Sequence, residues 1–296
     1  MRKFLLVVAT VCGCSLFGLS PTMADVRIGI LAKNGPAKVL KKWELTGDYL
    51  TGKLGEPVKI IPLDFDKVTP AVVAGDVDFF LVNSSMFVTL QLKYGATPVA
   101  TMINSRQGKA LQSFGGVVIT SAYNDKINSF EDLKGKKFAA VKKNSFGGWQ
   151  MAYKEMTAKG IDPFTDFSSL LFLGKHDNVV FAVQNEDVDA GTVRTDTLER
   201  MVANGAVSME EFKVIEAKKE GDFPFVCSTQ LYPEWPLAKV AATGAFLSAR
   251  VVAALKELKA DDKAAKAAKI VGWTDPLDYS GVEALQQSLH LGAYAR

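Results

Sequence analysis

The alternation of strand and helix patterns constrains the fold of this chain most strongly. An apolar strand pattern at 26–32 is followed by a helix pattern that opens at Pro36 and ends before Gly55. Further strand patterns at 57–65, 76–83 and 97–104 are separated by helix patterns around 68–73 and at 84–94. Regular alternation of this kind predicts an α/β sheet covered by helices.

The same alternation restarts after Gln112. Strand patterns lie at 114–120, 136–142, 170–174 and 187–193, with helix patterns at 144–159 and 176–185. The first unit, at about 88 residues, is small for a complete α/β unit, so we expect the C-terminal tail, with a long helix at 248–268, to complete it. The predicted fold is α/β and two-lobed, each lobe a mixed sheet with covering helices. Lobe 1 comprises 25–113 and 222–296 and lobe 2 comprises 114–221, with crossover strands near 111–116 and 221–228 as the hinge.

The first 24 residues have the pattern of a secretory signal peptide. Arg2 and Lys3 precede an apolar run at 4–11 and a small-residue stretch that ends at Ala24, where we expect cleavage. The apolar run is too short for the ~20 residues of a membrane-spanning helix. An alternative is a lipid on Cys14, which would tether the protein to the membrane. The chain is therefore expected in the periplasm.

The composition of the mature chain excludes several classes of protein. Without Arg2 and Lys3, 33 basic residues face 32 acidic ones, so bulk charge does not favour nucleic-acid binding. After cleavage at Ala24 only Cys227 remains, which excludes an intramolecular disulfide. No later apolar run reaches spanning length. We expect a monomer whose core alone holds the fold.

Two strand-to-helix junctions are candidate ligand sites. Ligands of open parallel sheets bind at the carboxyl ends of strands, where helix N-termini present free backbone amides. Each junction here adds hydroxyl groups or glycines, which allow close backbone approach. Ordinary helix capping is the structural alternative at both. The candidate residues are Asn83, Ser84 and Ser85 after one strand and Ser145, Phe146, Gly147 and Gly148 after another.

Two further side chains carry suitable chemistry for an anion. His176 lies near a helix start, where a structural role is the alternative. Arg194 follows a buried strand pattern and would bind an oxyanion through its planar fork, unless it pairs with Asp196 or Glu199.

Catalytic and metal sites are not indicated. A catalytic triad could be sought in Ser145, His176 and Asp177. However, Ser145 is not within a G-x-S-x-G motif, and the acid directly follows the histidine. The mature chain has two histidines and one cysteine, without a recognised metal-ligand spacing. Neither of the glycine-rich nucleotide motifs occurs. We expect no enzyme, no metal and no cofactor.

Nearly all of the mature chain resembles a known family. The similarity is densest in GDVDFFLVNSSMFV (75–88), INSFEDLKGKKFAAVKKNSFGGWQMAYKEMTAKGIDP (127–163) and GKHDNVVFAVQNEDVDAGTVRTDTLE (174–199). These stretches resemble the periplasmic binding proteins of phosphate, phosphite and phosphonate transport and the related input domains of bacterial sensor kinases. The resemblance implies hinged closure of two lobes without catalysis.

The resemblance also implies roles for individual residues. The helix start at 145–148 matches the family's oxyanion loop, and His176 matches a histidine that contacts the oxyanion. Phe65 and Phe87 stand where phosphonate binders commonly present tyrosines, and Arg194 before Asp196 disfavours an amine-bearing ligand. With Phe146 and Trp149, the two phenylalanines are expected to line the cleft.

The leading functional hypothesis is a binding protein for a small phosphorus- or sulfur-centred oxyanion, delivered to an ABC-type membrane permease. The alternative is a periplasmic sensory module whose closed form is read by a membrane histidine kinase. A third hypothesis is an exported α/β protein whose cleft has lost its ligand.

Overall fold

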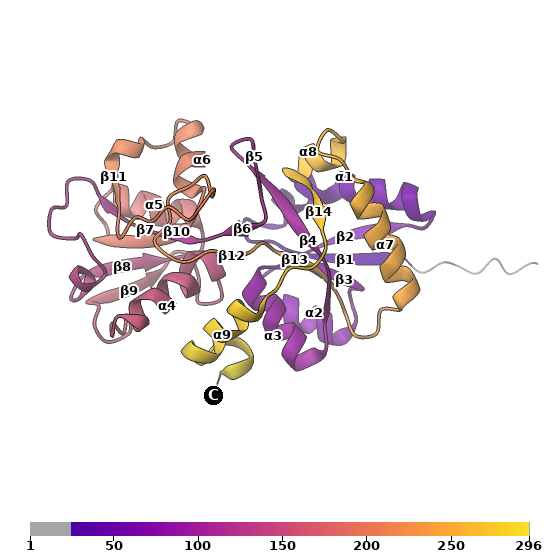
Figure 1. Cartoon of the computed structure of the whole chain (residues 1–296), viewed down its shortest axis with the longest axis horizontal. Helices are drawn as coiled ribbons and strands as arrows, with labels where there is room; N and C mark the ends of the chain where they lie inside the picture. Colours follow the sequence, from indigo (N-terminus) through magenta and orange to yellow (C-terminus); the bar gives the residue numbers. More distant parts are fainter. Residues whose placement is uncertain (1–24, 296) are drawn as a thin grey trace, which may run out of the picture.

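The computed structural model describes residues 25–295 as two α/β lobes that lie side by side along the long axis of the molecule (Figure 1). Each lobe has its own sheet, and a short two-stranded ribbon lies between them. The predicted two-lobed α/β class is confirmed. The predicted signal peptide, its cleavage after Ala24 and the alternative lipid at Cys14 lie outside the described residues.

The first sheet takes its strands from both ends of the described chain. Its order is β14-β4-β13-β3-β1-β2, with β5 paired to β4. β1 pairs in parallel with β2 and β3, whereas β13 and β14 run antiparallel to their neighbours, so the sheet is mixed as predicted. Its strands are β1 (Val26–Leu31), β2 (Val58–Leu63), β3 (Phe79–Leu81), β4 (Thr97–Arg106), β5 (Lys109–Leu111), β13 (Pro236–Lys239) and β14 (Ile270–Thr274).

Six helices belong to this lobe: α1 (Pro36–Leu54), α2 (Val68–Ala74), α3 (Ser84–Tyr94), α7 (Ala245–Glu257), α8 (Lys263–Ala268) and α9 (Ser280–Leu289). The longest, α1, begins at a proline and ends at Gly55, whose left-handed backbone conformation closes the helix. Val39, Trp43 and Leu50 form its buried face. Leu40, the residue after Val39, is 40% exposed because successive residues of a helix point in different directions.

The predicted helix at 248–268 is instead two helices, α7 and α8. Leu258 follows α7 with an extended backbone, and its side chain is buried. The Asp262 carboxylate then accepts the backbone N–H of Lys259 at 2.8 Å. A local side-chain acceptor and a buried leucine therefore interrupt a stretch whose alanines and lysines favour a continuous helix.

The second sheet has the order β11-β7-β10-β8-β9. β8 is parallel to β9 and β10, and β7 is antiparallel to β10 and β11. Val117 and Ile119 belong to one apolar cluster and Val118 to another, as the two-residue period of a strand requires. The strands are β7 (Gly116–Ser121), β8 (Lys137–Ala140), β9 (Ser169–Phe172), β10 (Ala190–Arg194) and β11 (Phe212–Val214).

The helices of the second lobe are a π-helical turn (Phe146–Gln150) continued by α4 (Met151–Ala158), then α5 (His176–Gln184) and α6 (Thr197–Ala203). Short 3-10 turns lie at Glu131–Leu133, Met209–Glu211 and Gly292–Tyr294.

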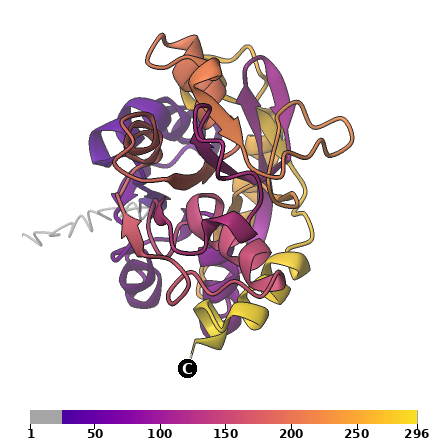
Figure 2. The ribbon, with the colours of Figure 1, turned by 90° about the vertical axis from the view of Figure 1, so that its left-hand side faces the viewer.

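The ribbon between the lobes pairs β6 (Ser113–Phe114) with β12 (Tyr232–Pro233). Of the two strands that connect the lobes, β6 lies within the predicted segment 111–116, whereas β12 lies C-terminal to the predicted segment 221–228. Ser228 donates its backbone N–H to Gly116 and accepts the N–H of Val118, both at 2.9 Å, so this segment runs beside β7. The C-terminal α9 contacts both α3 and α4, and lies along the lower edge of the molecule in Figure 2.

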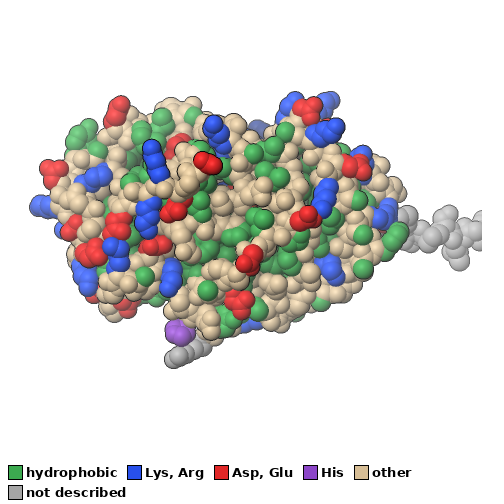
Figure 3. All heavy atoms as spheres, viewed as in Figure 1, with side chains coloured by type: hydrophobic (Ala, Val, Ile, Leu, Met, Phe, Trp, Pro, Cys, Tyr) green, Lys and Arg blue, Asp and Glu red, His purple; other side chains and the backbone are tan. Residues whose placement is uncertain are grey.

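Charges of both signs are interspersed over the face of the molecule in Figure 3. Within residues 25–295, no helix is long and apolar enough to cross a bilayer.

Candidate functional site

Two cavities contain residues of both lobes. The larger has a volume of about 560 Å³ and the smaller about 20 Å³. Leu31, Lys33, His176, Arg194 and Trp235 line both of them, so the cavities adjoin. Three of these five side chains can donate a hydrogen bond from a basic group.

The small cavity collects most of the residues predicted from the sequence. Its volume corresponds to about one water molecule, so it is a deep annex of the larger space rather than a complete ligand pocket. The predicted residues that line it are Phe65, Asn83, Ser145, Phe146, Gly147, His176 and Arg194.

The helix start beside this annex is π-helical. The N–H of Gln150 donates to the carbonyl of Ser145 at 3.1 Å, a five-residue closure. The first amides of such a helix have no partner within it, and π-helical turns occur often at functional sites. A methyl group on Gly147 would approach the Phe114 ring to 2.9 Å, so close packing alone requires this glycine. Both the binding role and the packing role are compatible with its position.

Asn83 both caps a helix and lines the annex. Its Oδ1 accepts the N–H of Met86 at 3.0 Å, and its Nδ2 donates across the lobes to the carbonyl of Asn144 at 3.3 Å. Capping explains one end of this side chain, while the other end helps to hold the lobes together.

His176 is a neutral hydrogen-bond donor. Its Nδ1 accepts the backbone N–H of Arg194 at 3.2 Å, which assigns the ring proton to Nε2. Burial lowers the pKa of His176 well below its usual value, and the positive charges of Lys33 and Arg194 lower it further. The Nε2–H group is therefore available to a ligand acceptor in the cavities that His176 lines.

Arg194 is the centre of a buried ionic network. Its side chain is 6% exposed and pairs with Glu234, which is fully buried and lies between β12 and β13. Its Nε lies 3.5 Å from Asp196, and its guanidinium stacks over the Phe114 ring, 4.1 Å from the centroid. Burial favours the neutral form of Glu234, but Arg194 and the Asn104 amide outweigh it, so the pKa of Glu234 is lowered. Glu234 is therefore a carboxylate here.

The sequence interpretation of Arg194 was incomplete. Asp196 was among the expected partners, but Glu234 was not, because it is 40 residues away. The only available signal was a lone acidic residue within the otherwise apolar segment 231–238.

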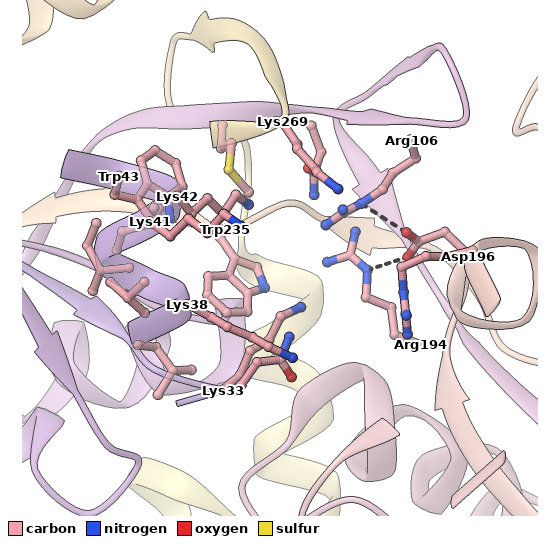
Figure 4. A pocket seen from close by; sticks show the side chains of 18 of the residues that line it. Lys33, Lys38, Lys41, Lys42, Trp43, Arg106, Arg194, Asp196, Trp235 and Lys269 are labelled. Atoms are coloured by element: carbon pink, nitrogen blue, oxygen red, sulfur yellow. Dashed lines mark ion pairs between the residues drawn. The ribbon is translucent and has the colours of Figure 1, made fainter. Parts of the chain in front are cut away.

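A second ion pair also joins the lobes. Arg106 at the end of β4 places its Nε 3.0 Å from Asp196, in the turn between β10 and α6. Both side chains are largely buried, at 15% and 10% exposure. Figure 4 shows Asp196 between Arg106 and Arg194. Together with the Arg194–Glu234 pair, these contacts hold β4 and the β12–β13 segment against the end of β10.

Five predicted residues do not line either cavity. Ser84 donates its hydroxyl to the carbonyl of Pro233 at 2.6 Å, and Ser85 Oγ accepts from Gln286 at 2.8 Å. Phe87 packs edge-on against Tyr279, and Trp149 stacks on Tyr153 in the core of the second lobe. A methyl group on Gly148 would lie 2.5 Å from Val141. The observed contacts of these five residues are contacts of tertiary packing.

The lysines of the large cavity were not among the residues predicted from the sequence. Six lysines line it: Lys33, Lys38, Lys41, Lys42, Lys266 and Lys269. Figure 4 shows Lys33, Lys38, Lys41, Lys42 and the Trp235 indole on one side of the cavity and Arg106 and Arg194 on the other, with Lys269 beside Arg106. The spacing of the α1 lysines at 38, 41 and 42 places them on one helix face, which is the signal that the sequence offered.

This concentration of positive charge perturbs the lysines themselves. Burial lowers the pKa of Lys33 to about 7, and Arg194 and Arg106 contribute to the decrease. Burial also lowers the pKa of Lys42 well below its usual value, with further contributions from Arg106 and Lys33. A bound anion would reduce the repulsion among these positive groups, so the site favours an anionic ligand.

A metal centre has no support in this part of the chain. Between residues 25 and 295, no three His, Cys, Asp or Glu side chains lie close enough together to hold a metal ion.

Comparisons with known proteins identify the family. Residues 28–280 match the family model described as ABC transporter, phosphonate, periplasmic substrate-binding protein. The tetrathionate sensor histidine kinase TtrS of Salmonella typhimurium is 33% identical over 260 residues, covering 87% of this chain and 42% of the kinase. The phosphate-import protein PhnD of Mycolicibacterium smegmatis is 30% identical over 137 residues, covering 43% of this chain and 41% of the relative. The matches thus span about two-fifths of the length of these curated relatives.

Among solved structures, PhnD1 of Prochlorococcus marinus in complex with methylphosphonate has the same fold. The TM-score is 0.70 at 17% identity, over 90% of this chain and 98% of that one. The family resemblance expected from the sequence is confirmed by the match to 253 residues of this chain. The chain belongs to the family of phosphonate-type periplasmic substrate-binding proteins of ABC transporters.

Proposed function

We propose that this protein captures a small oxyanion, phosphorus- or sulfur-centred, between its two lobes and delivers it to an ABC-type membrane permease. The convergence of Lys33, His176 and Arg194 on both cavities is the observation that carries the proposal. These groups come from both lobes and supply N–H donors. The carboxylates nearest to them, Asp196 and Glu234, are already paired with arginines. Family membership supports the same function.

Closure of the lobes is the proposed binding step. The ribbon of β6 and β12 provides the crossing, and the pairs Arg194–Glu234 and Arg106–Asp196 tie the lobes together once they meet. A ligand bound between the lobes would add contacts to both and favour the closed form by its differential affinity.

We further propose that binding involves no chemical step. In a Ser-His-Asp triad the histidine Nδ1–H donates to a carboxylate. Here His176 Nδ1 accepts a backbone N–H, and Asp177 is paired with Arg200. His176 and Asp177 therefore do not have the hydrogen bonds of a catalytic triad.

A sensory role is the second candidate. The 33% identity to the tetrathionate sensor histidine kinase extends over 87% of this chain, which supports a ligand-sensing module that signals to a membrane kinase. It also favours a sulfur-centred anion. Neighbouring permease genes would support transport, whereas a neighbouring kinase with a response regulator would support signalling.

The proposed location is the periplasm, reached through a signal peptide that is cleaved after Ala24. A lipid anchor at Cys14 is the alternative mature form, and the mass of the purified mature protein distinguishes the two. We propose a monomer in either case.

A binding screen tests the proposed function. The purified protein is heated with phosphate, phosphite, methylphosphonate, sulfate, thiosulfate or tetrathionate, and the best ligand is then examined by small-angle scattering. A ligand at a hundredfold excess over its Kd stabilises the native state by ~2.7 kcal/mol, which raises Tm. The radius of gyration should also decrease. No thermal shift with any of these anions at millimolar concentration would refute oxyanion binding.

A further inference from the structure

The large cavity is bigger than a single tetrahedral oxyanion requires. Its volume of about 560 Å³ lies within the range of roughly 300–1,000 Å³ that is typical of pockets for drug-sized ligands. A phosphate, sulfate or methylphosphonate ion has only five heavy atoms and would leave most of this space to water. The size of the cavity therefore matches a larger ligand.

The charges of this cavity are compensated unevenly. Arg106 and Arg194 share Asp196 and Glu234, and Arg200 pairs with Asp177. The six lining lysines form no ion pair with any carboxylate of residues 25–295. The uncompensated charge thus belongs to the lysines, of which Lys38, Lys41 and Lys42 lie on the side of the cavity opposite the arginines (Figure 4).

The position of the lysines at α1 costs stability in the absence of an anion. Lys38, Lys41 and Lys42 lie in the first two turns, on one face, and the first turn has no acidic residue. Like charges at this spacing repel one another, and the positive end of the helix dipole disfavours cations there. A bound anion would remove both penalties.

Apolar side chains also line the large cavity. Met102 and Leu81 from the sheet line the cavity, and the Trp235 indole lies on the lysine side, across the cavity from the arginines. The Nζ of Lys33 lies 5.1 Å from the centroid of the indole, so the ring also borders the annex. A ligand that spans the cavity would place charged groups at its ends and an apolar segment over the indole.

We propose that the lysine side of the large cavity is a second anion subsite, so that the ligand is an elongated anion with a charged group at each end. One end binds at Lys33, His176 and Arg194, and the other binds among the lysines of α1 and α8. This inference rests on the proposed function, because it assigns a ligand class to the same site.

Matched anions test the second subsite. Ethane-1,2-disulfonate is compared with ethanesulfonate, and methylenediphosphonate with methylphosphonate, by calorimetric titration of the purified protein at fixed ionic strength. Within at least one pair, the anion with two charged ends should bind roughly 10- to 100-fold more tightly, the range expected for one additional charged contact.

Lysine variants locate the second end. Lys38→Gln combined with Lys266→Gln should weaken binding of the two-ended anion roughly tenfold, while the one-ended anion changes less than twofold. Lys263→Gln is the matched control, because Lys263 is exposed on the same α8 helix and does not line the cavity. It should bind both anions like the unmodified protein.

The outcomes separate the two proposals. If phosphate, sulfate or a one-ended anion binds but neither pair shows a preference, the second subsite is refuted and the proposed function stands. A preference that persists in the Lys38→Gln, Lys266→Gln protein also refutes the subsite as placed. If no anion binds at all, both proposals are wrong.

Discussion

Anion binding to this protein should take up a proton at Lys33. This side chain lines both cavities, and burial together with the charges of Arg194 and Arg106 lowers its pKa to about 7. Asp196 and Glu234 oppose this decrease but do not cancel it. About half of the free protein molecules therefore carry a neutral Lys33 at pH 7.

The other basic groups around Lys33 contribute in the same direction. Lys33 lowers the pKa values of His176 and Lys42 in turn, so these three groups compete for protons. An anion in the cavity reverses part of this repulsion. If its contact with Lys33 is worth the ~1.5–3 kcal/mol of a charge-assisted hydrogen bond, the pKa of Lys33 rises by about one to two pH units.

The sign of the pH dependence follows from the proton balance. Between pH 7 and the higher pKa of the complex, the complex holds more protons than the free protein, so the affinity decreases as the pH rises. Below about pH 6 Lys33 is charged in both forms and its contribution is constant. Between pH 6 and pH 9 the affinity should decrease roughly 8- to 50-fold.

Calorimetry in two buffers with different ionisation enthalpies measures the protons directly. The ligand must be fully ionised from pH 6 to pH 9, as sulfate and alkyl disulfonates are, so that its own titration does not contribute. Uptake of about half a proton is expected at pH 7. The Lys33→Gln protein should take up clearly fewer protons, and Lys263→Gln should behave like the unmodified protein. An unchanged pH profile in Lys33→Gln would show that the reasoning about Lys33 is wrong.

Two further predictions concern stability. Arg194→Met should lower the free energy of unfolding by about 3–5 kcal/mol, because it leaves Glu234 buried without its cation, and adding Glu234→Gln should restore part of the loss in urea titrations; strictly additive effects would contradict a coupled pair. Gly148→Ala should lower stability by about 1–3 kcal/mol as well as binding, because its methyl group would lie 2.5 Å from Val141 and 2.9 Å from His176. An unchanged Tm for Gly148→Ala would contradict this packing argument.

The order of the elements could be predicted because each depends on local pattern. The start of α1 at Pro36, its end before Gly55 and the helix start after Asn83 are all set by neighbouring residues. Where the pattern was ambiguous, tertiary contacts decided. The segment near 221–228 was predicted as a crossing strand, but Ser228 bonds to β7, and the crossing lies at β12.

The candidate site was predictable only in part, for a similar reason. The helix start at 145–147 and His176 follow strand ends, so local sequence predicts their position at the edge of the sheet. Ser84 and Ser85 follow a strand in the same way, yet their hydroxyls bond to Pro233 and Gln286. The direction of a side chain at a helix start depends on partners that are distant in sequence, which a local pattern does not specify.

Because Arg194 is paired within the protein, it provides less positive charge to balance the negative charge of a ligand. From the sequence, Arg194 was expected either to bind the oxyanion through its fork or to pair with Asp196 or Glu199, and in the structure it pairs with both Glu234 and Asp196. A guanidinium that already has a carboxylate partner contributes less net charge to a ligand, although its Nε has no hydrogen-bond partner among residues 25–295. Its backbone N–H also holds the His176 ring in position.

The cavity lysines have no carboxylate partner among residues 25–295. A lysine is a flexible point charge, whereas a paired arginine is fixed in geometry, so the two types suit different tasks. Arg194 and Arg106 would fix the relative position of the lobes and the orientation of His176. The lysines would supply the countercharge and adjust to the length of the anion. On this division of roles, replacing Arg194 should affect lobe closure and stability first, while replacing the cavity lysines should affect the selection of ligands by charge.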